Sequence, residues 1–331
     1  GGSSSLGALA KEKQRVVILV DDLTRPTPVQ QVLPLLLEIL DRAGINQEQI
    51  RFIFALGTHR PLNREEMALK IGPDLVGRHT CENHNCFAGD FVDLGGGSYG
   101  TSLMISRPVI EADLVITLNT ITKHRFFYAS GGAKMILPGV AHIDSILHNH
   151  GDMVGFDVLR EEEHRYGKAR HEMHEAAKAL MRETDLVCVD VTVNPLRQIT
   201  GMYVGDCVDV FEASIDEALE TYILDFDFAD YAPSDRADVG IFRMGFHSSD
   251  AIQMARSLDK WEQVCAIPLI ISDCSDGIYY DGKSHGPYKD HVEGLEGQGV
   301  YPNPPLEEGI KGKGYRSSIV YSPHLDPKST H

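Results

Sequence analysis

The chain has 331 residues, is 42% hydrophobic and 24% charged, and carries a formal net charge of −17 at pH 7. This length favours two domains over a single core, and the composition is typical of a globular enzyme. The acidic charge argues against nucleic acid and anionic membranes as partners, because both are bound by basic surfaces. No signal peptide precedes the first predicted strand and no apolar run is long enough to cross a bilayer, so we expect a cytoplasmic protein.

Polar residues follow the first predicted strand. Residues 14–20 form a β-branched run typical of a buried parallel strand, and Asp22 and Arg25 come directly after it. A helix is expected next, with Thr27 as its N-cap and its end near Arg42. Arg25 offers a planar guanidinium suited to a carboxylate, and Asp22 could orient either a ribose hydroxyl or Arg25 itself.

Two later strands also end in polar residues. Residues 50–56 predict a second strand, which leads to His59, and Asn63 is expected to start a short helix. Residues 113–119 predict another strand, whose exit leads to His124. Because the carboxyl ends of parallel strands share one edge of a sheet, these side chains should meet where ligands bind. His59 and His124 are therefore a candidate pair of acid/base groups.

The segment after this strand concentrates reactive side chains. Gly131 and Gly132 form a turn that could aim several backbone N–H groups at a phosphate, with Ser130 beside them. Lys134 follows at once, with an amine that could bind the phosphate or join a cofactor covalently. His150 closes the segment and could act as a metal ligand or a proton carrier.

The remaining chain continues the alternation of strands and helices. An acidic, Pro-containing stretch at 225–235 resembles a connection between domains, after which the alternation restarts. We therefore predict an α/β protein of two domains, 1–225 and 226–331, with mainly parallel sheets and an active-site cleft between them. The predicted elements are a helix at 160–182, a strand at 186–193, a helix at 211–223, and then a strand at 239–244, a helix at 250–264 and a strand at 266–272.

Four motifs resemble the nickel-dependent lactate racemase family. They are DDLTRPTP at 21–28, LGTHR at 56–60, the HR…SGGAKMILPGVA stretch at 124–141, and the Asn-His pair at 149–150, within a match from near Ser3 to about Ser275. Members of this family racemise or epimerise 2-hydroxyacids with a nickel-pincer nucleotide, a pyridinium mononucleotide that carries Ni2+. The N-terminal strands usual in the family are missing before Ser3, so either a shortened chain or a compact branch is expected.

The resemblance implies a role for each matched residue of the N-terminal domain. Lys134 would join the nucleotide through a thioamide, and His150 would complete the coordination of the nickel. His59 and His124 would be two opposed acid/base groups, which take the hydroxyl proton while the cofactor accepts hydride from C2. In the same way, the resemblance implies that Arg25 binds the substrate carboxylate, that Asp22 holds the ribose or Arg25, and that Ser130, Gly131 and Gly132 cradle the nucleotide phosphate.

The C-terminal domain departs from the family pattern at the substrate site. The family has a Tyr-Gln pair followed by a Lys, whereas this chain has Ile252, Gln253 and Arg256. Gln253 and Arg256 are expected to contact the substrate, and Arg is not interchangeable with Lys at a carboxylate. The substitutions favour a larger or more polar 2-hydroxyacid than lactate, such as a sugar acid or a malate-like diacid.

Two other functions are compatible with these residues. A metal-dependent hydrolase without nickel would use the His and Asp residues but would leave Lys134 without a role. A small-anion binding protein without catalysis would explain a cleft but not its reactive groups. Expected partners of the racemase are a small 2-hydroxyacid and the enzymes that make the cofactor, and a homo-oligomer is compatible with the sequence.

Overall fold

The computed structural model divides the chain into two compact units, Gly1–Ile223 and Leu224–His331. The cleft predicted between the domains, and the roles predicted for each domain, stay predictions. Within the part of the chain that the structure describes, no helix is long and apolar enough to cross a membrane. The described residues are 5–59, 61–124, 127–152, 167–194, 196–222, 237–243, 265–271 and 319–321.

The first unit is built on a six-stranded sheet in the order β10-β9-β6-β1-β2-β3. All neighbouring strands run parallel except β9 and β10, which are antiparallel at one edge. The buried runs of Val, Ile and Leu in β1 and β6 suit strands that are covered on both faces. The predicted α/β class is thus confirmed. The strands are β1 (Val16–Val20), β2 (Ile50–Phe54), β3 (Thr80–Asn83), β6 (Leu114–Thr120), β9 (Asp185–Val193) and β10 (Ile199–Gly205).

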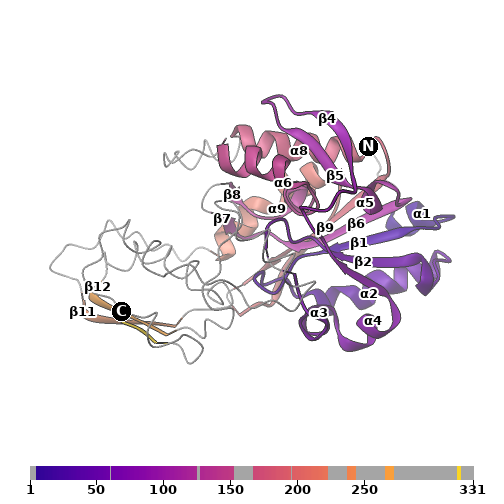
Figure 1. Ribbon diagram of the computed structural model, residues 1–331. Coiled ribbons are helices and arrows are strands. Elements are labelled where there is room, and N and C mark those ends of the chain that lie inside the picture. Colours follow the sequence, from indigo (N-terminus) through magenta and orange to yellow (C-terminus); the bar gives the residue numbers. More distant parts are fainter. Residues whose placement is uncertain are drawn as a thin grey trace. The chain divides into compact units, whose positions relative to one another are not determined.

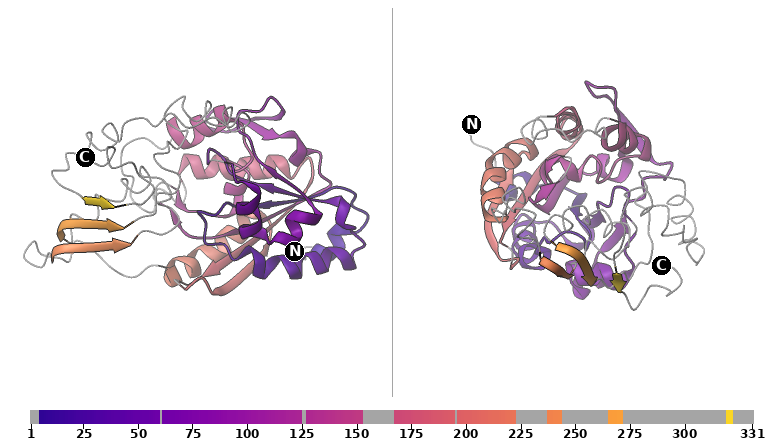
Figure 2. Two further views of the ribbon diagram at one scale, coloured as in Figure 1. Left: turned by 60° about the horizontal axis from the view of Figure 1, so that its bottom comes forward. Right: turned by 90° about the vertical axis from the view of Figure 1, so that its left-hand side faces the viewer.

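Helices cover both faces of this sheet. Figure 1 shows α2, α3 and α4 on one side, and α8 with the hairpin of β4 and β5 on the other, and Figure 2 gives the same layers from two other directions. The α-helices are α1 (Leu6–Ala10), α2 (Val29–Arg42), α3 (Arg64–Ile71), α4 (Pro73–Arg78), α5 (Arg107–Ile110), α6 (Ile143–Ile146), α8 (Lys168–Leu180) and α9 (Cys207–Tyr222). Shorter turns are the 3-10 helices η1 (Gln47–Gln49) and η2 (Gly132–Met135) and the π-helix η3 (Leu147–Asp152).

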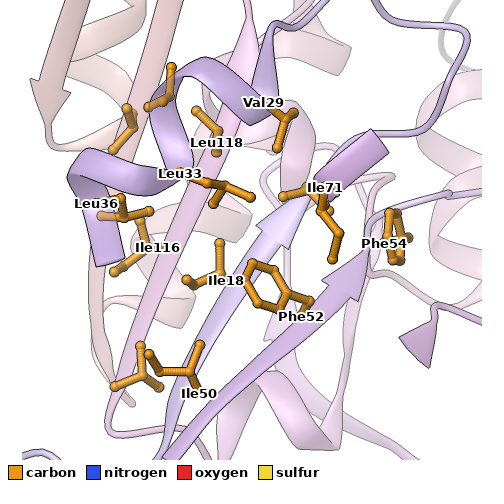
Figure 3. Packing of buried hydrophobic residues seen from close by; sticks show 14 of the residues in the cluster. Ile18, Val29, Leu33, Leu36, Ile50, Phe52, Phe54, Ile71, Ile116 and Leu118 are labelled. Carbon is orange, nitrogen blue, oxygen red and sulfur yellow. The ribbon is translucent and has the colours of Figure 1, made fainter. Parts of the chain in front are cut away.

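Helix α2 illustrates how the core forms. Its apolar residues recur at helical spacing, so one face, including Val29, Leu33 and Leu36, packs on Ile18 and Phe52 of the sheet (Figure 3). Each such side chain contributes about 1.5–3 kcal/mol when it is fully buried. The helix thereby anchors the loop that leads into it, which carries Asp and Arg residues of the candidate site.

The start of α2 corrects one expectation. The N-cap is Pro28, and the first helical residue is Val29. Thr27 was predicted as the N-cap, but its hydroxyl instead donates a hydrogen bond to Asp21. The predicted cap at Asn63 is confirmed, because its side chain accepts from the N–H of Glu66 at 2.9 Å in a capping box.

Two antiparallel pairs were not predicted. β4 (Phe91–Gly96) pairs with β5 (Ser102–Ser106), and β7 (Lys123–His124) pairs with β8 (Tyr128–Ala129). The first pair mixes apolar residues with polar residues and Gly, and each strand of the second pair has only two residues, so neither shows the β-branched runs of the central strands. The second pair includes His124 and therefore lies within the candidate site.

The second unit contains a parallel sheet in the order β11-β12-β13. Its first two strands correspond to the strands predicted at 239–244 and 266–272. The connection predicted at 225–235, the helix predicted at 250–264 and the first part of the helix predicted at 160–182 lie outside the described residues. The strands are β11 (Ala237–Arg243), β12 (Cys265–Ile271) and β13 (Ile319–Tyr321).

Candidate functional site

The polar residues that follow β1, β2 and β6 lie at a topological switch point of the sheet. Strand β1 lies between β2 and β6, so the chain leaves β1 toward one edge through β2 and reaches the other edge through β6. In open parallel sheets, ligands bind outside the carboxyl ends of strands at such a point. Asp22 follows β1, His59 follows β2, and His124 follows β6.

Asp22 and His59 form a hydrogen-bonded pair. The Nδ1 atom of His59 lies 2.5 Å from Oδ2 of Asp22, whose side chain is only 6% exposed. The other carboxylate oxygen accepts from the N–H and the hydroxyl of Thr24, at 3.1 and 2.6 Å. Burial alone would raise the pKa of Asp22, but the charge of His59 and its hydrogen bond, with the charge of Arg25, hold that pKa far below its usual value. Asp22 is therefore an ionised carboxylate that orients the His59 ring.

This pairing was not predicted from the sequence. Asp22 was expected to hold a ribose hydroxyl or Arg25, and the structure directs its carboxylate to His59. Arg25 lies partly buried three residues along the same loop, where its charge also acts on Asp22. The ribose contact and the carboxylate contact expected of these residues stay predictions.

Lys70 of α3 holds the loop that carries Asp22 and Arg25. Its buried ammonium lies 2.6 Å from Oδ1 of Asp21 and donates to the carbonyl oxygens of Asp22 at 2.7 Å and Arg25 at 3.3 Å. This residue was not predicted as part of the site. The available signal was its position beside Ile71 on the inward face of α3, where a charged side chain needs a partner.

A second cluster surrounds the buried ring of Phe127. The ring centroid of His150 lies 4.1 Å from that of Phe127, and the His124 centroid lies 5.0 Å away. The amine of Lys134 lies 4.7 Å from the same centroid. The structure thus brings His124, Lys134 and His150 to one aromatic side chain. Phe127 was also missed, although it lies between these residues in the sequence.

The Gly pair is required by close packing. Both residues have positive φ, +87° for Gly131 and +57° for Gly132. A Cβ on Gly131 would lie 2.1 Å from Cδ1 of Ile121, and one on Gly132 would lie 2.9 Å from the carbonyl oxygen of Cys207. Only Gly adopts this backbone at so close an approach without strain.

Part of the predicted phosphate cradle is already hydrogen-bonded within the protein. The N–H of Gly132 donates to Oδ2 of the buried Asp190 at 2.9 Å. The hydroxyl of Ser130 accepts from the N–H of Thr122 at 3.0 Å and lies 3.0 Å from the carbonyl oxygen of Thr120. These bonds fix the turn before Lys134, and the phosphate contact stays a prediction.

The two clusters are joined through the backbone. The N–H of Gly57, in the loop that leads to His59, donates to the carbonyl oxygen of Gly139 at 3.0 Å. Gly57 has φ +56°, and a Cβ there would lie 3.3 Å from Cβ of Pro138. The loop after β2 therefore docks on the segment that follows Lys134.

Gln253 and Arg256 lie outside the described residues. Among the residues that the structure describes, no group of three or more His, Cys, Asp or Glu side chains is placed to hold a metal ion.

Comparison with known proteins finds similar sequences for part of the chain. Residues 1–158 match the family described as "Lactate racemase N-terminal domain". A lactate racemase from Lactiplantibacillus plantarum is 32% identical over 208 residues, which cover 62% of this chain and 48% of that protein. A lactate racemase from Thermoanaerobacterium thermosaccharolyticum is 36% identical over 150 residues, 45% of this chain and 35% of that protein. The N-terminal part of the chain is therefore similar to the N-terminal domain of lactate racemases.

Solved structures support the same fold. The lactate racemase apoprotein from Thermoanaerobacterium thermosaccharolyticum superposes with a TM-score of 0.68 at 24% identity, covering 99% of this chain and 79% of that one. A protein from Thermotoga maritima gives a TM-score of 0.61 at 17% identity, covering 80% and 69%. The chain spans about half or less of the length of the two curated relatives it matches.

Proposed function

We propose that the protein is a racemase or epimerase that inverts C2 of a 2-hydroxyacid with a nickel-pincer nucleotide. One observation carries the proposal: Lys134, His124 and His150 meet at the ring of Phe127. The residues proposed as covalent attachment point, metal ligand and acid/base group therefore all contact one side chain. The names of the two curated relatives support the same reaction class.

The residues present fit the cofactor. Lys134 lies next to a sharp turn and could form the thioamide. His150, whose ring also contacts Phe127, could bind the nickel. A nucleotide that brings its own sulfur and carbon ligands needs little more than one imidazole from the protein. When bound, the cofactor would accept hydride from C2 and return it, a step that no side chain can perform.

His59 is suited to move the hydroxyl proton of the substrate. Its Nδ1 faces the carboxylate of Asp22 at 2.5 Å, so Nε2 is the ring nitrogen that would exchange the proton with a substrate. When Nε2 takes the proton, the ionised Asp22 stabilises the imidazolium that forms. His124 would serve the opposite face, and the two histidines together would allow either enantiomer to react.

Arg25 would hold the substrate carboxylate while the planar 2-oxoacid turns between the two faces. It follows the same strand as Asp22, and Lys70 fixes the loop that carries both. Arg256 and Gln253 would complete the substrate site from the C-terminal part. The broad guanidinium of Arg256 favours a substrate with a second polar group over lactate.

The experiment is an assay of protein produced together with the cofactor-synthesis enzymes. Racemisation or epimerisation is measured over lactate, malate-like diacids and sugar acids, with C2-deuterated substrates. We expect turnover with the label kept at C2, and a higher kcat/KM for a diacid or sugar acid than for lactate. Rapid exchange of C2 hydrogen with solvent would contradict hydride transfer. Hydrolysis of esters or amides with no racemisation would favour the hydrolase, and binding of 2-hydroxyacids with no turnover would favour an anion-binding protein.

A further inference from the structure

Asn149 lies between His150 and helix α8. Its side chain is completely buried. Its Nδ2 atom donates to the carbonyl oxygen of Ala169 at 3.0 Å, and its Oδ1 atom lies 2.9 Å from Nδ1 of His150. The amide therefore bridges the first turn of α8 and the imidazole that would bind nickel.

The two bonds determine which nitrogen of His150 carries a hydrogen. A backbone carbonyl only accepts hydrogen bonds, so the amino group of Asn149 must face Ala169. The amide oxygen then faces Nδ1 of His150, and because this oxygen also only accepts, Nδ1 must be the protonated nitrogen. In the neutral ring, Nε2 consequently keeps its lone pair, which is the form that binds a metal ion.

We propose that Asn149 is a positioning residue that holds His150 as the Nδ1–H tautomer, with Nε2 ready to bind nickel. The nickel half of this inference rests on the proposed function. The hydrogen-bond partner of His150 differs in charge from that of His59. His59 faces the charged carboxylate of Asp22, which stabilises a protonated ring, whereas His150 faces a neutral amide. The neutral partner suits a ring that stays unprotonated as a ligand.

The first measurement is made on the cofactor-free protein. Two-bond 1H–15N correlation spectra distinguish the Nδ1–H and Nε2–H tautomers of each histidine, and His150→Gln assigns the signal. The unmodified chain should show His150 as Nδ1–H at neutral pH. Asn149→Ala should shift it toward Nε2–H, and Asn149→Asp, which keeps an oxygen acceptor, should preserve Nδ1–H.

A matched control separates positioning from anchoring of the π-helix η3. The hydroxyl of Thr101 lies 2.8 Å from Nδ1 of His148, the neighbouring histidine of η3. Thr101→Val removes this anchor and should leave the His150 tautomer unchanged. An equal shift of the His150 signal in Thr101→Val and Asn149→Ala would overturn the inference. An Nε2–H signal for His150 in the unmodified protein would also overturn it, and this second test does not depend on the folding of any variant.

The second measurement is nickel retained by protein loaded with cofactor and then dialysed against a chelator. Loss of a partner behind a metal-binding histidine lowers metal affinity by roughly 10- to 100-fold. We expect a loss of that size in Asn149→Ala and retention close to normal in Thr101→Val. If His150→Ala retains nickel fully, the metal role of His150 in the proposed function is wrong, while the tautomer result stands or falls by the spectra alone.

Discussion

At the scale of single residues, the chemistry of the site depends on pairs of side chains. The carboxylate of Asp22 lies 2.5 Å from Nδ1 of His59, and the amide of Asn149 lies 2.9 Å from Nδ1 of His150. One partner is charged and the other is neutral. The difference in charge fits the proton-transfer role proposed for His59 and the metal-binding role proposed for His150.

The Asp22–His59 pair predicts a non-additive loss of activity. His59→Gln should lower turnover by roughly 10²–10⁴-fold, because positioned proton transfer contributes about that much. Asp22→Asn removes the charge that stabilises the imidazolium and should give a smaller loss. Because the carboxylate acts through the ring, the double variant should be no slower than His59→Gln. Steady-state kinetics of the four proteins test this.

A suitable control for that cycle is Asp113→Asn. Asp113 pairs with Arg15 at 3.0 Å, before the first residue of β6 and away from the strand ends that form the site. It should leave turnover unchanged. Losses that simply multiply in the Asp22/His59 double variant would show that the two residues act independently.

Lys134 should be the site of covalent attachment. Lys134→Arg keeps a cation near the Phe127 ring, 4.7 Å from the amine in the unmodified chain, but cannot form the thioamide. We expect intact-mass spectra to show a nucleotide adduct on the unmodified protein and none on Lys134→Arg or Lys134→Ala. Thermal unfolding serves as the control, since neither change alters the core. An adduct that persists in both variants would place the attachment elsewhere.

At the scale of elements, the turn before η2 determines where Lys134 lies. Gly131 and Gly132 pack against the exit of β6 and against α9, and Asp190 of β9 accepts the N–H of Gly132 at 2.9 Å. Three elements distant in sequence therefore meet at this turn. The positive φ angles and the short approach distances together exclude a side chain.

The packing at Gly131 predicts a larger cost for Gly131→Ala than for Gly95→Ala. Both positions have positive φ, +87° and +102°, but only Gly131 has a close neighbour, Cδ1 of Ile121 at 2.1 Å from the added Cβ. The positive-φ backbone is strained for Ala at both sites, by about 1–3 kcal/mol each. Overpacking at Gly131 adds about 1–3 kcal/mol. Urea unfolding of both variants measures the difference, and equal losses would contradict the packing argument.

At the scale of the whole molecule, buried histidines should make the fold sensitive to acid. Burial lowers the pKa of His84 to about 4 and that of His174 to about 4. Because these folded pKa values lie below the usual 6.5, the unfolded chain binds more protons between pH 6.5 and 4. The free energy of unfolding should therefore fall as the pH falls through that window. Asp190 acts in the opposite sense, since burial raises its pKa to about 6.

His84→Gln should flatten this pH dependence. Nε2 of His84 lies 2.9 Å from the carbonyl oxygen of Ala141, and a Gln amide can donate to the same oxygen without titrating. A pKa of about 4 in place of 6.5 corresponds to about 3 kcal/mol between pH 6.5 and 4. Denaturant unfolding at pH 4, 5, 6 and 7 compares the slopes of the two proteins. An unchanged slope in His84→Gln would mean that His84 does not carry this dependence.

The central strands and the polar residues at their ends were predictable from the sequence. Apolar β-branched runs predicted β1, β2, β6 and β9, and Asp22, His59 and His124 were placed after three of them. The pairs β4–β5 and β7–β8 were not predicted, because the first mixes apolar residues with polar residues and Gly and the strands of the second have only two residues each. Local signals thus located the elements that bury many side chains and missed those that bury few.

The sequence alone predicted the α/β class and placed the candidate site residues at the ends of the central strands, because both depend on short-range patterns of apolar and polar residues. Only the tertiary structure decided the partners. Asp22 and His59 are 37 residues apart and Asn149 and Ala169 are 20 apart, so their bonds depend on how loops and helices pack. Phe127 likewise gains its importance from three side chains that meet only after folding. The residue type sets the chemistry of a side chain, and the packing of the fold determines which neighbouring group that side chain interacts with.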